Sequence, residues 1–243
     1  MMNDLTPSYH QSKQTMNRYS LFIILSLAAA NSTTTAQAPP DSVATQIRRL
    51  RSGDVVDRSR AAKALGAMGV AAEPAVPALV QALRDENSIF VGDVVESLRR
   101  IGAPAVPALV QALDGPDAKL RHQAAVALSR IGPTDSAAFK ALVKALKDPS
   151  ANVRRRAALA LENAGKVGTF RDGAIMGLIR ALADRDGTVR ISAAVALGHI
   201  GADAREAAGP LSQLLNDDDA ELRAAAAEAI REINASRPPG GPR

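Results

Sequence analysis

Histidine is the side chain of this sequence best suited to acid–base or metal chemistry, and three are present: His10, His122 and His199. No two of them stand at metal-ligand spacing, and the chain has no cysteine to complete such a site. Ser129 and Ser192 have no adjacent base of the kind that activates a nucleophile. The glycine-rich phosphate loops GxGxxG and GxxxxGK[ST] are both absent. The sequence therefore predicts no catalytic residue, no metal site, no cofactor, and a chain that is not an enzyme.

Charge and aromatic content argue against nucleic-acid binding. The formal net charge is +5, and aromatic residues make up 2% of the chain. Without residues 1–30 the chain loses two basic charges and one acidic charge, which leaves a mild +4. Enzymes that act on an extruded base stack it against aromatic or apolar side chains, and beyond residue 30 only three phenylalanines are available. We expect no nucleic-acid partner.

A repeat of about 33 residues positions the charged side chains. One position, which we name the anchor, recurs six times, and the steps between anchors are 33, 30, 33, 36 and 33 residues. The anchors are Arg58, Val91, Arg121, Arg154, Arg190 and Arg223. A fixed period of this size indicates stacked supersecondary units, none of which can bury its apolar face alone.

Each unit contains two apolar stripes at helical spacing. Before the anchor, apolar residues recur at i, i+3, i+4 and i+7, as in Val106, Leu109, Val110 and Leu113. After the anchor the stripe is rich in alanine, as in Ala157, Ala158, Leu161 and Ala164. A glycine follows the second stripe in five units, where a left-handed helix cap is expected, at Gly69, Gly102, Gly132, Gly165 and Gly201. The pattern predicts an all-α solenoid of six antiparallel helix pairs.

The repeat resembles the HEAT repeat, and its short form is similar to the HEAT-like units of the phycobilisome lyase group. The matching stretches read AVPALVQALRD, DPSANVRRRAALALENAG and DRDGTVRISAAVALGHIG. The resemblance covers residues 41–234 and implies an α-solenoid that works as a protein-interaction module or scaffold. It leaves one alternative open, a HEAT-like enzyme or lyase-type auxiliary subunit, either bilin lyase-like or hydroxylase-like. HEAT-type deoxyhypusine hydroxylase needs repeated His-Glu dipeptides, and this sequence has none.

The resemblance also implies a structural ladder of turn aspartates and anchor arginines. Its members here would be Asp148, Asp184 and Asp217 with Arg154, Arg190 and Arg223. In the second unit Val91 replaces the arginine, so Asp85 has to use a neighbouring unit or water. We interpret Phe90 beside it as a core residue that fills a thinner packing layer.

In proteins with this repeat, the second helices line the concave side of the stack. Their polar positions lie two and nine residues after the anchor, and a spacing of seven puts both on one side of a helix. The predicted partner-binding residues are Arg60, Asp93, Arg100, Gln123, Arg130, Arg156, Asn163 and His199. Because the first four units are biased towards basic residues, we expect an acidic protein partner; the plainer interpretation is a solvated charged face.

The first residues predict export. Arg18 precedes an apolar run of twelve, residues 19–30, and small residues follow, as in a secretory signal peptide. Twelve helical residues rise only about 18 Å, too short to cross a bilayer. We therefore expect residues 1–38 to be a signal peptide with its flanking segment, residues 41–234 to form the repeat domain, and residues 235–243 to be a disordered tail. The mature chain is expected to be a periplasmic or secreted monomer without a membrane span.

Overall fold

Six successive helix pairs make up the part of the chain that the structure describes. The computed structural model describes residues 42–132, 136–166 and 168–235, and within them every regular element is a helix. This confirms the predicted all-α solenoid. The predicted signal peptide lies outside the described residues, as does the predicted tail apart from Ala235, which ends the last helix.

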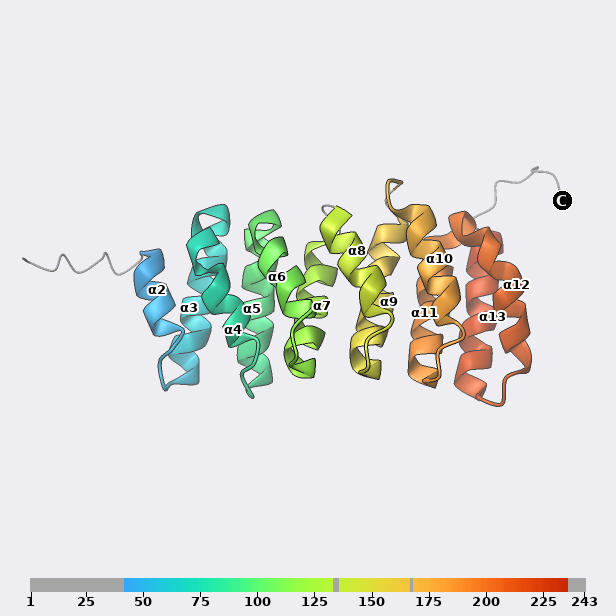
Figure 1. Ribbon diagram of the computed structural model, residues 1–243, viewed down its shortest axis with the longest axis horizontal. Coiled ribbons are helices and arrows are strands. Elements are labelled where there is room, and N and C mark those ends of the chain that lie inside the picture. Colours follow the sequence, from blue (N-terminus) through green and yellow to red (C-terminus); the bar gives the residue numbers. More distant parts are fainter. Residues whose placement is uncertain (1–41, 133–135, 167, 236–243) are drawn as a thin grey trace, which may run out of the picture. The chain divides into compact units, whose positions relative to one another are not determined.

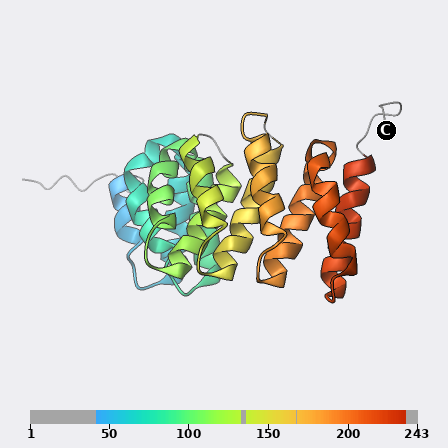
Figure 2. The ribbon, with the colours of Figure 1, turned by 45° about the vertical axis from the view of Figure 1, so that its right-hand side comes forward.

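Each pair consists of a first and a second helix. The first helices are α2 (Val43–Arg49), α4 (Val76–Ala82), α6 (Val106–Leu113), α8 (Ser136–Ala145), α10 (Arg171–Ala181) and α12 (Ala208–Gln213). The second helices are α3 (Val55–Ala67), α5 (Ser88–Ile101), α7 (Ala118–Ile131), α9 (Ala151–Gly165), α11 (Gly187–Ile200) and α13 (Ala220–Ala235). Every second helix packs against the next one, so neighbouring pairs in the sequence are neighbours in the stack (Figures 1 and 2).

Local sequence signals set where the second helices begin and end. The side chains of Asp54, Asn87 and Asp117 accept hydrogen bonds from the first backbone N–H groups of α3, α5 and α7. Four of the five predicted cap glycines have a positive φ, between 56° and 85°. The prediction for Gly165 is wrong, because α9 continues through it and a methyl group there would overlap the side chain of Ile200.

Short 3₁₀ segments complete several of the connections. They are η1 (Gly69–Ala75), η2 (Ala103–Ala105), η3 (Gly201–Ala207) and η4 (Leu214–Asn216). The longer connection between the fourth and fifth pairs brings Phe170 onto Phe139, with the ring centroids 4.8 Å apart and the rings nearly parallel. Phe90 is 1% exposed, which confirms that it is a core residue.

Small side chains let the second helices approach closely. The alanines of α9 and α11 that face neighbouring helices are fully buried, and a Cβ on Gly198 would lie 2.8 Å from the Cα of Ala229 in α13. By contrast, a Cβ on the exposed Gly92 of α5 would meet nothing within 4 Å. These two helical glycines therefore differ in burial and in the room beside them.

We expect Gly198→Ala to destabilise the protein and Gly92→Ala to stabilise it. Both changes gain about 1 kcal/mol of helix propensity. Only the first forces apart two helix backbones, and overpacking of this kind costs about 1–3 kcal/mol. Urea midpoints of the two variants measure the difference. A higher midpoint for Gly198→Ala than for the wild type would show that α11 and α13 are not held this close.

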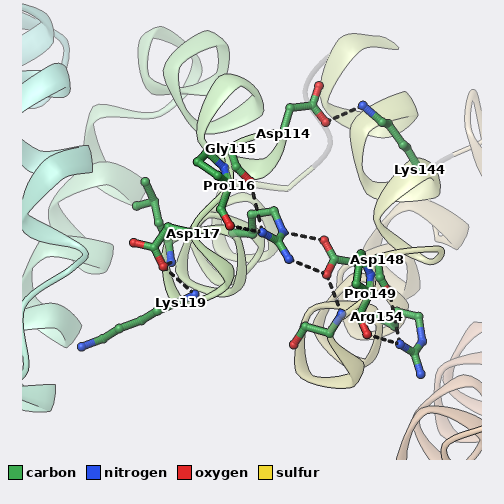
Figure 3. A network of polar contacts seen from close by, with 12 residues as sticks. Asp114, Gly115, Pro116, Asp117, Lys119, Lys144, Asp148, Pro149 and Arg154 are labelled. Carbon is green, nitrogen blue, oxygen red and sulfur yellow. Dashed lines mark hydrogen bonds and ion pairs between the residues drawn. The ribbon is translucent and has the colours of Figure 1, made fainter.

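Anchor arginines clamp the loop of their own pair. The Nη1 group of Arg121 donates to the carbonyl oxygens of Gly115 and Pro116, at 3.1 and 2.9 Å (Figure 3). Arg154 binds the equivalent carbonyl oxygens of its own loop, at 2.9 and 3.1 Å. Arg58, Arg190 and Arg223 make the same kind of contact. Each anchor arginine therefore fixes the turn between the two helices of its pair.

The same arginines reach forward to the aspartate of the next pair. Arg121 binds Asp148 through two bonds of 2.7 and 3.0 Å, and Arg154 binds Asp184 at 2.7 and 2.8 Å. Two further ion pairs of the ladder have longer N···O distances, 3.1 Å between Arg58 and Asp85 and 3.7 Å between Arg190 and Asp217.

The ladder implied by the resemblance is thus present, but its pairing is different. Each aspartate side chain binds the arginine of the preceding pair; where its own pair has an arginine, that arginine donates to backbone carbonyl oxygens of the same loop. Asp85 uses a neighbouring unit, as expected. Arg223 has no carboxylate partner among the described residues; its contacts there are the carbonyl oxygens of Asp217 and Asp218.

One step of the ladder is missing, between the second and third pairs. The anchor there is Val91, and the aspartate position of the following pair is occupied by Gly115. Both members of the ion pair are therefore replaced together. This junction instead has two exposed ion pairs, Arg84–Asp117 at 3.3 Å and Lys119–Glu86 at 2.9 Å, and exposed pairs of this kind contribute little to stability.

Candidate functional surface

The polar sides of the six second helices form one surface, which we name the second-helix face. In α9, for example, Ala157, Ala158 and Leu161 are fully buried, whereas Arg156 is half-buried and Asn163 exposed. The helical period therefore separates the core from the predicted partner-binding positions, as expected. What the eight predicted residues offer to a partner depends on the contacts that they already make.

Over α3 and α5 the predicted residues are neutralised by neighbours. Arg60 pairs with Asp57 at 3.1 Å, and Arg100 pairs with Glu96 at 2.9 Å. Hydrogen bonds from Arg99 and then Arg100 lower the pKa of Glu96 to about 2, so this carboxylate stays charged. Neither Asp57 nor Glu96 could be singled out from the sequence pattern.

Asp93 is neutralised across a helix interface. Its Oδ2 atom lies 3.2 Å from the Nζ of Lys63, close enough for an ion pair, although the geometry does not make a directed hydrogen bond. The side chain of Asp93 is 17% exposed, against 66% for Lys63. This pair connects α3 to α5, so Asp93 contributes to stacking more than to a free surface.

Asn163 and His199 are also engaged. The amide of Asn163 donates to the carbonyl oxygen of Ser129, at 3.1 Å. Nδ1 of His199 lies 3.2 Å from Glu162, which also binds Lys166 at 2.7 Å. Burial alone would raise the pKa of Glu162, but the hydrogen bonds from Lys166 and His199 hold it below its ordinary value.

A basic cluster remains on α7 and α9, comprising His122, Arg130, Arg155 and Arg156. No carboxylate among the described residues forms an ion pair with any of the four. The Nε atom of Arg156 is buried without a hydrogen-bond partner. Burial lowers the pKa of His122, and the nearby Arg156 and Arg155 lower it further. Burial likewise lowers the pKa of Arg156, together with the charges of Arg155 and Arg130. Positive charge is therefore concentrated here, and no carboxylate in the described part of the chain compensates it.

Two residues of the basic cluster, His122 and Arg155, were not among the predicted partner-binding residues. The sequence suggested a solvated His122, but the structure places it half-buried beside two arginines. Gln123, which was predicted, lies next to it on α7 and is also half-buried. A signal existed in the sequence: α7 contains no acidic residue, and α9 contains only Glu162.

A groove lies on the same face between α3 and α5. Its volume is about 450 Å³, and its surface is mostly apolar. The lining residues are Val55, Val56, Ser59, Arg60, Lys63, Asn87, Ile89 and Asp93. Two of them are large apolar side chains in contact with solvent, Val56 at 57% and Ile89 at 75% exposure. We name this feature the α3–α5 groove.

The described residues offer little else for chemistry. Across residues 42–132, 136–166 and 168–235, no three His, Asp or Glu side chains gather as metal ligands would. The hydroxyl of Ser192 donates to the carbonyl oxygen of Thr188 within α11, at 2.9 Å. Among the helices described, none has the length and apolar character needed to cross a membrane.

Comparison with known proteins identifies the repeat. A family model of HEAT repeats matches residues 43–129, 106–176 and 175–238, which together span nearly all of the described chain. No curated protein sequence matches significantly.

Solved structures with the same architecture are numerous. The complex of CpcE and CpcF of phycocyanin lyase from Nostoc sp. PCC7120 is 24% identical, with a TM-score of 0.58, over 64% of this chain and 98% of that one. A designed armadillo repeat protein in complex with the peptide (KR)4 is 20% identical, with a TM-score of 0.52, over 79% of this chain and 100% of that one. At these identities the likeness concerns the fold alone.

Proposed function

The chain belongs to the HEAT repeat family, and from this premise we propose that it is a non-enzymatic protein-interaction module of the bacterial cell envelope. Repeat stacks present extended surfaces that bind other proteins. The observation that carries the proposal is the second-helix face, where a basic cluster has no counter-charge among the described residues, while five of the six other predicted residues are already engaged. A partner with acidic side chains would supply the missing charge.

The envelope location rests on the N-terminal sequence. Arg18, the apolar run of residues 19–30 and the small residues that follow have the order of a secretory signal peptide. With export, the partner is a periplasmic or secreted protein, and the chain meets it after the signal peptide within residues 1–38 is removed. The alternative is a HEAT-like enzyme or lyase-type auxiliary subunit inside the cell. Only the similarity of the fold supports this alternative.

Site-specific photo-crosslinking in the native cell tests the proposal. A photoreactive amino acid is placed at Asn163, exposed on the second-helix face, or at Lys140, exposed on α8. We expect one protein to be captured from Asn163 and not from Lys140, and the recovered chain to begin near residue 31 or 37. Capture from Lys140 alone would move the binding surface to the first helices. An unprocessed N-terminus, or turnover of a chromophore by the purified chain, would favour the enzymatic alternative.

A further inference from the structure

The basic cluster has the features of an anion site rather than of a solvated charged face. Three of its four side chains, His122, Arg155 and Arg156, are half-buried, so water solvates them incompletely. Guanidinium groups bind carboxylates through paired N–H···O bonds, and the buried Nε of Arg156 lacks an acceptor. Arg58 and Arg190 also have a buried Nε without an acceptor, but each of them is paired with an aspartate through another guanidinium nitrogen. Arg156 has no such carboxylate among the described residues, so the cluster can accept a negatively charged ligand.

The nearest acidic side chains cannot supply it. On α7 there is no carboxylate, and on α9 Glu162 is held by Lys166 and His199. On α5 Asp93 is held by Lys63, and Glu96 is held by two arginines. The carboxylates of α5 and α9 are consequently paired within the stack. The positive charges of the basic cluster are therefore available to an outside ligand.

The α3–α5 groove provides a different contact two helix steps away. It is lined mainly by apolar surface, and Ile89 and Val56 at its edge are exposed. Packed helices lie about 8–10 Å apart, so groove and cluster are about 16–20 Å apart along the face. An extended chain rises about 3.3 Å per residue and covers this distance with about five or six residues.

We propose that the second-helix face binds an extended acidic segment of a partner protein at two points, an apolar side chain in the α3–α5 groove and two adjacent carboxylates on the basic cluster. This rests on the proposed function and specifies the chemistry of its partner. A carboxylate pair suits the clustered positive charges of α7 and α9, and a leucine-sized side chain suits the apolar groove. The described aromatic rings offer no platform for nucleic-acid bases, since Phe90 is buried and Phe139 stacks on Phe170.

The test uses the purified chain and fluorescein-labelled peptides. Each peptide carries one leucine and one Glu-Glu pair in a glycine–serine background, with three, five or eight residues between them. Fluorescence anisotropy gives the dissociation constants. We expect the five-residue spacing to bind most tightly, and binding to weaken as salt rises, because exposed charges are screened beyond about 8 Å at physiological ionic strength.

Matched variants separate the two contacts from general attraction. Arg155→Glu with Arg156→Glu is expected to weaken binding at least tenfold. Lys140→Glu with Arg180→Glu changes net charge equally on the exposed first helices and is expected to leave binding within twofold. Ile89→Ser should weaken binding of the leucine peptide severalfold and leave a leucine-to-glycine peptide unaffected.

Two results would overturn the proposal: equal loss in both charge-reversed proteins, or no saturable binding by any of the three peptides. Photo-crosslinking distinguishes this failure from failure of the proposed function. Capture from Asn163 of a partner that lacks an acidic segment would retain the interaction module and reject this mode of recognition.

Discussion

Arg154→Ala is expected to lower the free energy of unfolding by about 3–5 kcal/mol, the range for removing one member of a buried ion pair. The side chains of Arg154 and Asp184 are 5% and 11% exposed. Burial alone would raise the pKa of Asp184, but hydrogen bonds from Arg154 and from the N–H of Asp186 hold it below its ordinary value. Without the guanidinium of Arg154, the carboxylate of Asp184 is left buried without its partner. The loop before α9 also loses the two hydrogen bonds that Arg154 donates to the carbonyl oxygens of Asp148 and Pro149.

Urea unfolding of Arg154→Ala beside Arg190→Ala checks this expectation. The Arg190–Asp217 contact is longer, 3.7 Å, and both side chains are more exposed, so its loss should cost about 1 kcal/mol or less. Because the pKa of Asp184 is lowered in the folded protein, the ion pair stabilises fully above the unfolded pKa, about 3.9. Its contribution is lost as pH falls through the folded value, so the gap between wild type and Arg154→Ala should narrow below pH ~4. Equal losses for the two variants would contradict the ranking.

Restoring the missing ladder step should produce strong coupling between two substitutions. Val91→Arg alone replaces a side chain that is 5% exposed with an unpaired charge, which we expect to cost about 3 kcal/mol or more. Gly115→Asp alone places a Cβ 3.2 Å from the carbonyl oxygen of Ala112, a tight contact that should cost about 1 kcal/mol. Together they recreate the forward ion pair, and we expect the double variant to recover about 1–3 kcal/mol relative to the sum.

Thermodynamic double-mutant cycles from urea unfolding measure this coupling. Val91→Arg with Gly115→Asn is the control, since asparagine has nearly the shape of aspartate without its charge. Additive effects in the aspartate cycle would show that position 91 does not reach position 115, and the ladder would then not be missing a step there.

The fold could be predicted from the sequence because its signal is repeated six times. An apolar stripe seen once is ambiguous, but the same stripe at a constant distance from an anchor specifies both helices and their stacking. The sequence predicted which kinds of residue form the ladder, the turn aspartates and the anchor arginines. It did not predict which arginine binds which aspartate. Asp148 and Arg154 are six residues apart, which suggests a contact within one unit. Packing instead brings Asp148 beside Arg121, 27 residues earlier, and sequence spacing cannot show that distance.

The candidate surface was predicted less well for a related reason. Helical periodicity assigned the eight residues to the polar side of the second helices, but whether they are free to bind a partner depends on their neighbours. Arg60 and Arg100 are neutralised within their own helices, and Asp93 is neutralised from the preceding one. His122 was missed because a lone histidine is usually solvated; its environment comes from α9, in the next repeat.

The forward pairing of the ladder also has a direction relative to protein synthesis. The chain is synthesised from its N-terminus, so each helix pair forms before the next one is available. The anchor arginine of a formed pair already donates to its own loop, and the aspartate that completes its ion pair is supplied by the next pair. The growing edge thus exposes a guanidinium, which water solvates readily, rather than a carboxylate awaiting a partner. Docking of each new pair then neutralises the previous edge. The third pair is the exception: with Val91 and Gly115 in place, it docks onto the second pair without a ladder ion pair, and the charges that meet there are those of the exposed pairs Arg84–Asp117 and Lys119–Glu86.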